Sequence, residues 1–258
     1  MTSRIFVISL TTAILSMSML HAEANPSDIN HLVLESMHQM PSGGGYSTSS
    51  NANRELRDAV TTTSGMLEIR PSHATPSYCS EATYLVFLKT LSALQSSHQL
   101  SLSPETVHAL KPNGQPDGTG IWGRWNANGP GTARLFYELG LGPNFTDLSQ
   151  AQPGDFLKIF WNDGIGATEH GHSVIFLRQD STARTLTFWS SNLPQNNIPG
   201  GYGEKTVPLS RIHRMLFSRL EHPANINRPL PHSDSYLSSM EHRSSTPAEM
   251  EEKCGILR

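Results

Sequence analysis

One of the two cysteines in this chain, Cys79, stands at the start of the apolar segment YCSEATYLVFLKTL. Apolar residues recur there at three- and four-residue spacings, which predicts a largely buried helix, and Pro76 and Ser77 precede it as start signals. The first turn of a helix has unpaired backbone N–H groups and a positive dipole end, which favour thiolate over thiol. The position of Cys79 therefore predicts a reactive thiol.

A histidine further along the chain could activate that thiol. His172 opens the predicted strand GHSVIFL, where its imidazole could take the proton of Cys79. One ring nitrogen would face the sulfur, and the other needs an acceptor that fixes the ring. Alternate residues of the strand TLTFWSSN share a face, which puts Ser190 and Asn192 on its apolar side. Asn192 is the first candidate for orienting His172, and Ser190 is the second.

Other polar groups near these residues have predicted roles. The backbone N–H of Cys79 could donate to an oxyanion, with Tyr78 or Ser80 nearby. His170 is the alternative histidine, but its position before the regular strand predicts a loop residue. His170 and His172 could also share a metal, although an isolated HxH is a weak metal signal.

Two simpler roles for the cysteine remain open. Cys79 could form a disulfide with Cys254, the second cysteine, which lies near the end of the chain. It could also be an inert core residue, as buried cysteines often are. A disulfide and a nucleophilic thiol exclude each other.

The elements that would position these residues are a helix and several strands. After the helix at Cys79, strands are predicted in the segments AQPGDFLKIFW, GHSVIFLRQ, RTLTFWSSN and GYGEKTVPL. Asp155, in the Pro-Gly-Asp turn, is expected to cap that turn, and Glu169 is expected to be solvated. The segment GTARLFYELGLG predicts a helix that stops at a glycine.

The tryptophans are candidates for substrate binding. Trp122 and Trp125 lie in a Gly- and Asn-rich setting, and Trp189 lies in the strand with Asn192. Together with Tyr78 they are predicted to contact substrate, and the alternative is that they cover the core. A catalytically inactive protein on the same scaffold could use these side chains and Trp161 to bind glycan or peptide.

The order of these pieces resembles the NlpC/P60 superfamily of papain-like cysteine peptidases, including its CHAP amidase branch. Four segments over roughly residues 76–220 carry the resemblance: YCSEATYLVF as the nucleophile segment, AQPGDFLKIFW as the turn and strand, GHSVIFL as the histidine strand, and FWSSN as the third polar position. The resemblance implies an α+β fold in which an antiparallel sheet packs against the helix that carries the catalytic cysteine. It further implies a cysteine peptidase or amidase that acts on peptidoglycan or another peptide and needs no metal or cofactor. A thiol acyltransferase or a protein peptidase is the related alternative.

Composition and the N-terminus suggest an exported protein. Residues 1–24 contain Arg4, the apolar run IFVISLTTAILSMSML and the small residues of AEA, which predicts a signal peptide cut before Asn25. We therefore expect a secreted or periplasmic protein with no stable membrane insertion after cleavage. The formal net charge of −3 gives no indication of nucleic-acid binding.

The remaining chain divides into three expected parts. Residues 25–75 are predicted as an N-terminal extension with a Gly- and Ser-rich linker, PSGGGYSTSSNAN. Residues 76–223 form the predicted hydrolase domain. Residues 224–258, which are polar, are predicted as an extended or partly disordered C-terminal tail.

Overall fold

The computed structural model describes residues 26–196 and 198–256. The helices are α1 (Pro26–His38), α2 (Ser50–Ala59), α3 (Cys79–Ser96), α4 (Pro104–Ala109), α5 (Gly120–Asn126), α6 (Gly131–Leu139), α7 (Ser235–Ser239) and α8 (Pro247–Lys253). The strands are β1 (Gly43–Gly44), β2 (Val60–Thr63), β3 (Met66–Ile69), β4 (Asn144–Phe145), β5 (Phe156–Phe160), β6 (Gly171–Asp180), β7 (Thr185–Asn192), β8 (Gly201–Pro208) and β9 (Arg214–Ser218).

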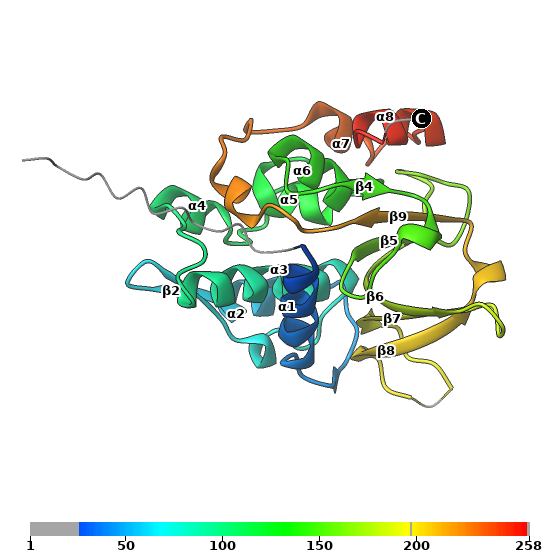
Figure 1. Ribbon diagram of the computed structural model, residues 1–258, viewed down its shortest axis with the longest axis horizontal. Coiled ribbons are helices and arrows are strands. Elements are labelled where there is room, and N and C mark those ends of the chain that lie inside the picture. Colours follow the sequence, from blue (N-terminus) through cyan, green and yellow to red (C-terminus); the bar gives the residue numbers. More distant parts are fainter. Residues whose placement is uncertain (1–25, 197, 257–258) are drawn as a thin grey trace, which may run out of the picture.

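The described strands form one large antiparallel sheet and a separate hairpin. The large sheet has seven strands in the order β1-β8-β7-β6-β5-β9-β4, and the hairpin pairs β2 with β3. Figure 1 shows helices α1, α2 and α3 to the left of the sheet, with α5 to α8 along the upper side of the molecule. The expected class, a mixed fold with helices against an antiparallel sheet, is therefore confirmed. The four strands predicted around Phe156, Val174, Phe188 and Lys205 are all present.

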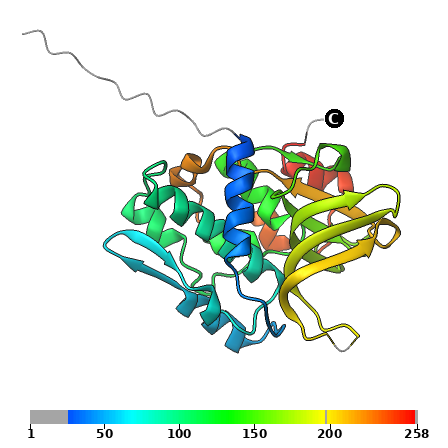
Figure 2. The same cartoon turned by 60° about the horizontal axis from the view of Figure 1, so that its bottom comes forward.

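Helix α3 packs against one face of this sheet. Phe87 of the helix lies edge-on to Phe156 of β5, with ring centroids 6.1 Å apart. Phe156, Ile175 and Trp189, one from each of three neighbouring strands, belong to the same buried cluster as the helix. Helix α1 lies across α3 (Figure 2), where the Thr90 hydroxyl donates to Ser36 Oγ at 3.2 Å. Alternation along each strand therefore directs one set of side chains toward the helices.

The opposite sheet face encloses a second apolar cluster. Its members are Phe145, Leu157, Ile159, Val174, Phe176, Leu186, Phe188, Val207 and Phe217. His172 lies two residues before Val174 on β6, and Asn192 lies four residues after Phe188 on β7, so both belong to this face. The alternation predicted from the sequence thus places both polar residues on the face away from the main helix contacts.

The segment expected as an N-terminal extension is part of the domain. Helix α1 buries Ile29 and Val33, and the Gly-rich stretch forms β1 at the edge of the sheet, where Gly43 pairs with Tyr202. A Cβ atom on Gly201 would lie 2.0 Å from the carbonyl oxygen of Gly43, so this pairing requires a glycine. The linker prediction is wrong because these glycines permit close strand pairing instead of a free loop.

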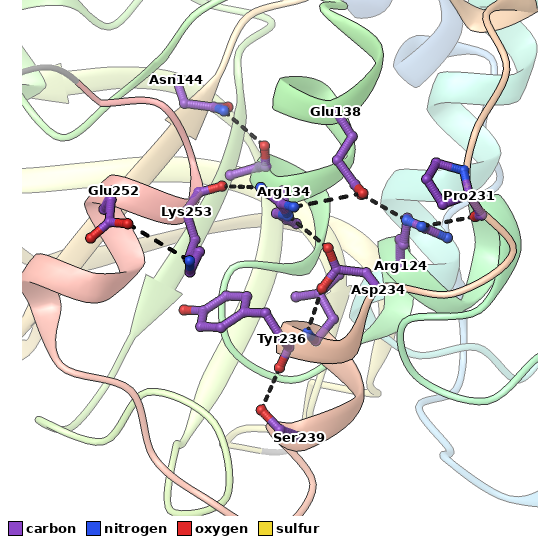
Figure 3. A network of polar contacts seen from close by, with 12 residues as sticks. Arg124, Arg134, Glu138, Asn144, Pro231, Asp234, Tyr236, Ser239, Glu252 and Lys253 are labelled. Atoms are coloured by element: carbon purple, nitrogen blue, oxygen red, sulfur yellow. Dashed lines mark hydrogen bonds and ion pairs between the residues drawn. The ribbon is translucent and has the colours of Figure 1, made fainter.

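The C-terminal segment is not a disordered tail. Figure 3 shows Arg134 at the centre of a polar network that joins α6 to this segment. Arg134 Nε donates to Asp234 at 2.8 Å, and its Nη1 donates to the carbonyl of Lys253 at 2.7 Å. Met250 and Cys254 are also buried. Composition predicted disorder because the partners that neutralise these polar residues lie far away in sequence.

The predicted signal peptide, residues 1–24, lies outside the described residues. Within residues 26–196 and 198–256, no helix has both the length and the apolar character needed to span a membrane.

Candidate active site

Cys79, His172 and Asn192 come together in the structure. Cys79 is the first residue of α3, and its thiol lies beside His172 on β6, whose interaction with it lowers the pKa of the thiol. His172 Nε2 lies 3.2 Å from Oδ1 of Asn192 at the end of β7. Because Asn192 occupies Nε2, the other ring nitrogen of His172 is available to the sulfur. The three residues therefore form a chain in which an amide oxygen orients an imidazole beside a thiol.

The approach to α3 is fixed against the strand that carries Asn192. Ser77 Oγ donates to Ser191 Oγ at 3.0 Å, and Ser191 Oγ donates to the Ser77 carbonyl at 3.0 Å. Both serines are completely buried. The Asn192 amide nitrogen donates to the carbonyls of Ser190 and Gly203 at 3.1 and 2.8 Å, which directs its oxygen toward the imidazole.

The thiol of Cys79 has an altered pKa. Burial alone would raise the pKa, but the hydrogen bond and charge of His172, the backbone N–H of Ser173 and the charge of Lys158 outweigh burial. The pKa falls from its ordinary value of 9.0 to about 7. A substantial fraction of Cys79 is therefore thiolate at neutral pH, the form that attacks carbonyl carbon.

Ser190, the second candidate for orienting the histidine, lies elsewhere. Its hydroxyl donates to the backbone carbonyl of Ser173 at 2.7 Å, and the residue is completely buried. Ser190 thus joins β7 to β6 beneath the site and makes no hydrogen bond with His172.

The sequence analysis did not identify Tyr46 as a site residue. Its side chain makes a hydrogen bond with Cys79, and burial, followed by the charge of Cys79, raises its pKa above the ordinary value. Strand β1 ends just before Tyr46, which forms a parallel bridge with Ser77. An aromatic residue within a Gly- and Ser-rich run was the only sequence signal for this position.

Glu81 lies in the first turn of α3 and is completely buried. Its Oε2 accepts a hydrogen bond from the backbone N–H of Tyr78 at 3.2 Å, while Oε1 has no partner. Burial, together with the negative charge of Cys79, raises the pKa of Glu81 to about 8 although the Tyr78 hydrogen bond opposes this. Glu81 is therefore mostly protonated at neutral pH.

The residues on either side of Cys79 are tied to neighbouring segments. The Tyr78 hydroxyl donates to Asn53 Oδ1 at 2.9 Å, and the Ser80 hydroxyl donates to Asn126 Oδ1 at 2.6 Å. The backbone N–H of Cys79, at the first position of the helix, is a donor without an intrahelical acceptor. That N–H and the Tyr46 hydroxyl are therefore two hydrogen-bond donors near the Cys79 sulfur.

The three residues open onto a cleft of about 870 Å³. The side toward α3 and the N-terminal segment is mainly polar and includes Tyr46, Thr48, Asn53, Tyr78, Ser80, Asp117, Asn126 and Asn128. The side toward the sheet includes Lys158, Trp161, Phe188, Leu193, Lys205, Val207 and Arg211.

Three tryptophans predicted to bind substrate do not reach the cleft. Trp122 and Trp125 are 2% and 1% exposed and pack around Tyr84 of α3. Trp189 is stacked on Tyr202 on the helix-facing side of the sheet. The prediction is wrong for Trp122 and Trp125 because GIWGRWN forms the buried helix α5 and not a loop, and wrong for Trp189 because its side chain is on the helix-facing side of β7. Tyr78 does line the cleft, as does Trp161.

Two predictions about the loop before His172 have different outcomes. His170 is an exposed loop residue at the cleft, as expected. Glu169, expected to be solvated, has a side chain that is only 5% exposed and accepts a hydrogen bond from Lys158 Nζ at 2.6 Å. Among the described residues, no group of three or more His, Cys, Asp or Glu side chains could hold a metal ion.

Cys254 is separate from the site. Both cysteines are free, so the predicted disulfide alternative is wrong. Cys254 is buried at the end of α8, where burial raises its pKa to about 12. The two thiols therefore have opposite pKa shifts, and only that of Cys79 is lowered.

Asp155 fixes the turn before β5. Its Oδ2 accepts the backbone N–H of Gln152 at 2.8 Å, which is the predicted turn cap. The same buried carboxylate also accepts hydrogen bonds from Arg219 and from Asn30 of α1. Asp155 therefore joins α1, the turn and the end of β9, and it does not line the cleft.

Comparison with known proteins identified no relatives. The sequence matches no family model, and neither the curated proteins nor the solved structures give a significant match.

Proposed function

We propose that this protein is a cysteine hydrolase that cleaves amide bonds, with peptidoglycan as its substrate. The observation that carries the proposal is the position of the Cys79 thiol beside His172, whose other side contacts Asn192 at 3.2 Å, in an open cleft. A thiol with a pKa of about 7 beside an oriented imidazole is suited to attack on a carbonyl. The order of helix, histidine strand and asparagine strand also resembles the NlpC/P60 arrangement, and a papain-like fold is part of this proposal.

The reaction would proceed in two stages. The Cys79 sulfur attacks the carbonyl carbon, and its proton passes to His172. The carbon–nitrogen bond then breaks as His172 protonates the leaving amine, which gives a thioester. Water, deprotonated by His172, hydrolyses the thioester and restores the thiol. The Cys79 backbone N–H and the Tyr46 hydroxyl stabilise the oxyanion of each tetrahedral intermediate.

The choice of substrate rests on the predicted export signal and the family resemblance. An exported amidase or endopeptidase would meet the stem peptides of the cell wall and the junction between sugar and peptide. A protein that only binds glycan through its tryptophans is less well supported, because Trp122, Trp125 and Trp189 are buried.

Digestion of purified peptidoglycan tests the proposal. Wild-type protein should release soluble fragments, and mass spectrometry of their new termini identifies the bond. Cys79→Ala should release none, whereas the matched control Cys254→Ala, which alters the cysteine outside the site, should remain active. Equal release by wild type and Cys79→Ala would contradict the proposal.

A further inference from the structure

The cleft contains two cations that have no anionic partner. Of the three Lys and Arg residues in its lining, Lys158 is ion-paired with Glu169 at 2.6 Å. The side chains of Lys205 and Arg211 have no ion pair or hydrogen bond within the part of the chain that the structure describes. The end of the cleft formed by Lys205 and Arg211, which we call the basic end, therefore has an uncompensated positive charge.

Strand pairing directs Lys205 into the cleft. Lys205 pairs with Phe188 across β7 and β8, and Val207, two residues later, also lines the cleft. Glu204 faces the other way and lies 3.5 Å from Arg178, so it does not neutralise Lys205. Burial and then the charge of Arg211 lower the pKa of Lys205, which is consistent with two cations held close together.

The basic end lies near His172, the residue that protonates the leaving amine in the proposed reaction. The His172 ring contacts the Phe188 ring edge-on, with centroids 5.5 Å apart, and Lys205 is beside Phe188. In the proposed reaction His172 protonates the leaving amine, so the amine product extends from His172 over Phe188. Paired strands are about 5 Å apart and an extended peptide advances about 3.4 Å per residue, which puts the cations within about three residues of the scissile bond.

We propose that Lys205 and Arg211 bind a carboxylate on the amine-product portion of the substrate. The preferred substrate is then an acidic peptide whose leaving amine is followed, within about three residues, by a free carboxylate. A guanidinium and an ammonium both donate charge-assisted hydrogen bonds to carboxylate, while Phe188 and Val207 form an apolar floor for the intervening chain. This inference rests on the proposed function, because the role of His172 defines the leaving side.

Removing the negative charge of the substrate carboxylates tests directly whether Lys205 and Arg211 bind them. Purified peptidoglycan is compared with the same material after its carboxylates have been converted to amides with carbodiimide and ammonia. Wild-type protein should digest the native material roughly fivefold to tenfold faster, which corresponds to the contribution of two partly exposed ion pairs. Lys205→Met and Arg211→Gln should each bring this ratio toward one. Arg178→Gln, which removes a cation of the same sheet outside the cleft, should keep the wild-type ratio.

A binding measurement separates this inference from the proposed reaction. Calorimetry with Cys79→Ala and soluble muropeptides, native or amidated, should show tighter binding of the native form. Adding Lys205→Met to Cys79→Ala should remove the difference. If wild type cleaves neither material but Cys79→Ala still binds the native muropeptides more tightly than the amidated ones, the proposed reaction is wrong and the carboxylate-binding site is supported. Equal rates and equal affinities for the two materials, or no measurable binding of either, would overturn the anion site.

Discussion

Asn192 Oδ1 lies 3.2 Å from His172 Nε2, whereas the neighbouring Ser190 hydroxyl donates to the backbone carbonyl of Ser173. Asn192→Ala should therefore lower kcat by roughly tenfold to a hundredfold, because the imidazole loses its orienting acceptor. Ser190→Ala, a matched change on the same strand face, should leave kcat near the wild-type value. Rates of peptidoglycan digestion measure both, and a loss confined to Ser190→Ala would contradict the assignment.

The catalytic residues should act as a unit. His172→Ala should lower the rate by roughly 10²–10⁴-fold, since it removes the group that activates the thiol and protonates the leaving amine. Adding Asn192→Ala to His172→Ala should cost little more, because the asparagine acts through the imidazole. Additive losses in the double variant would instead mean that Asn192 has an independent role. Far-UV circular dichroism checks that each variant is folded.

Alkylation of Cys79 should depend on pH with a midpoint of about 7, the pKa that the site gives this thiol. Below that pH the thiol keeps its proton and reacts slowly; above it the thiolate reacts quickly. Cys254, with a pKa of about 12 in its buried position, should stay unmodified over the same range. Iodoacetamide labelling followed by peptide mapping resolves the two cysteines. A midpoint at or above the ordinary value of 9.0 would contradict the lowered pKa of this thiol.

Tyr46→Phe should lower kcat by roughly 10²-fold with little change in KM, because the hydroxyl is expected to stabilise an oxyanion that exists only during reaction. Tyr236→Phe is the matched control, since the Tyr236 hydroxyl donates to Ser245 Oγ outside the cleft. Steady-state kinetics on the released fragment separate the two constants. A change in KM alone would assign Tyr46 to substrate binding.

The buried Glu81 should make stability depend on pH. Its folded pKa of about 8 exceeds the ordinary value of 4.5, so the unfolded chain loses this proton at lower pH than the folded chain. The stabilising contribution is complete below pH 4.5 and is lost as the pH rises to about 8. Glu81→Gln should raise the free energy of unfolding at pH 8 by about 4 kcal/mol and change it little at pH 4. Urea unfolding at pH 4 and pH 8 measures the free energy of unfolding. An equal effect of Glu81→Gln at both pH values would show that Glu81 does not lose its proton between them.

The predictable parts of the fold were those determined by local pattern. Helix α3 and the strand of His172 follow from apolar periodicity, and the two faces of β7 follow from alternation, which brought Asn192 into consideration. The unpredictable parts depend on distant partners. Asp234 looks like an ordinary polar residue until Arg134 is placed 2.8 Å away. Tyr46 is similar, because only the pairing of β1 with β8 brings its loop to Cys79.

That pairing also bears on the order of folding. Gly43 pairs with Tyr202 at the sheet edge. Strands β1 and β8, which are remote in sequence, must therefore pair before the Tyr46 hydroxyl can reach the Cys79 sulfur. Contacts of such large sequence separation form slowly, because the loop between them must first close. During refolding, enzymatic activity should therefore return later than helical signal. On the proposed function, a newly synthesised chain would remain inert until β1 has paired with β8.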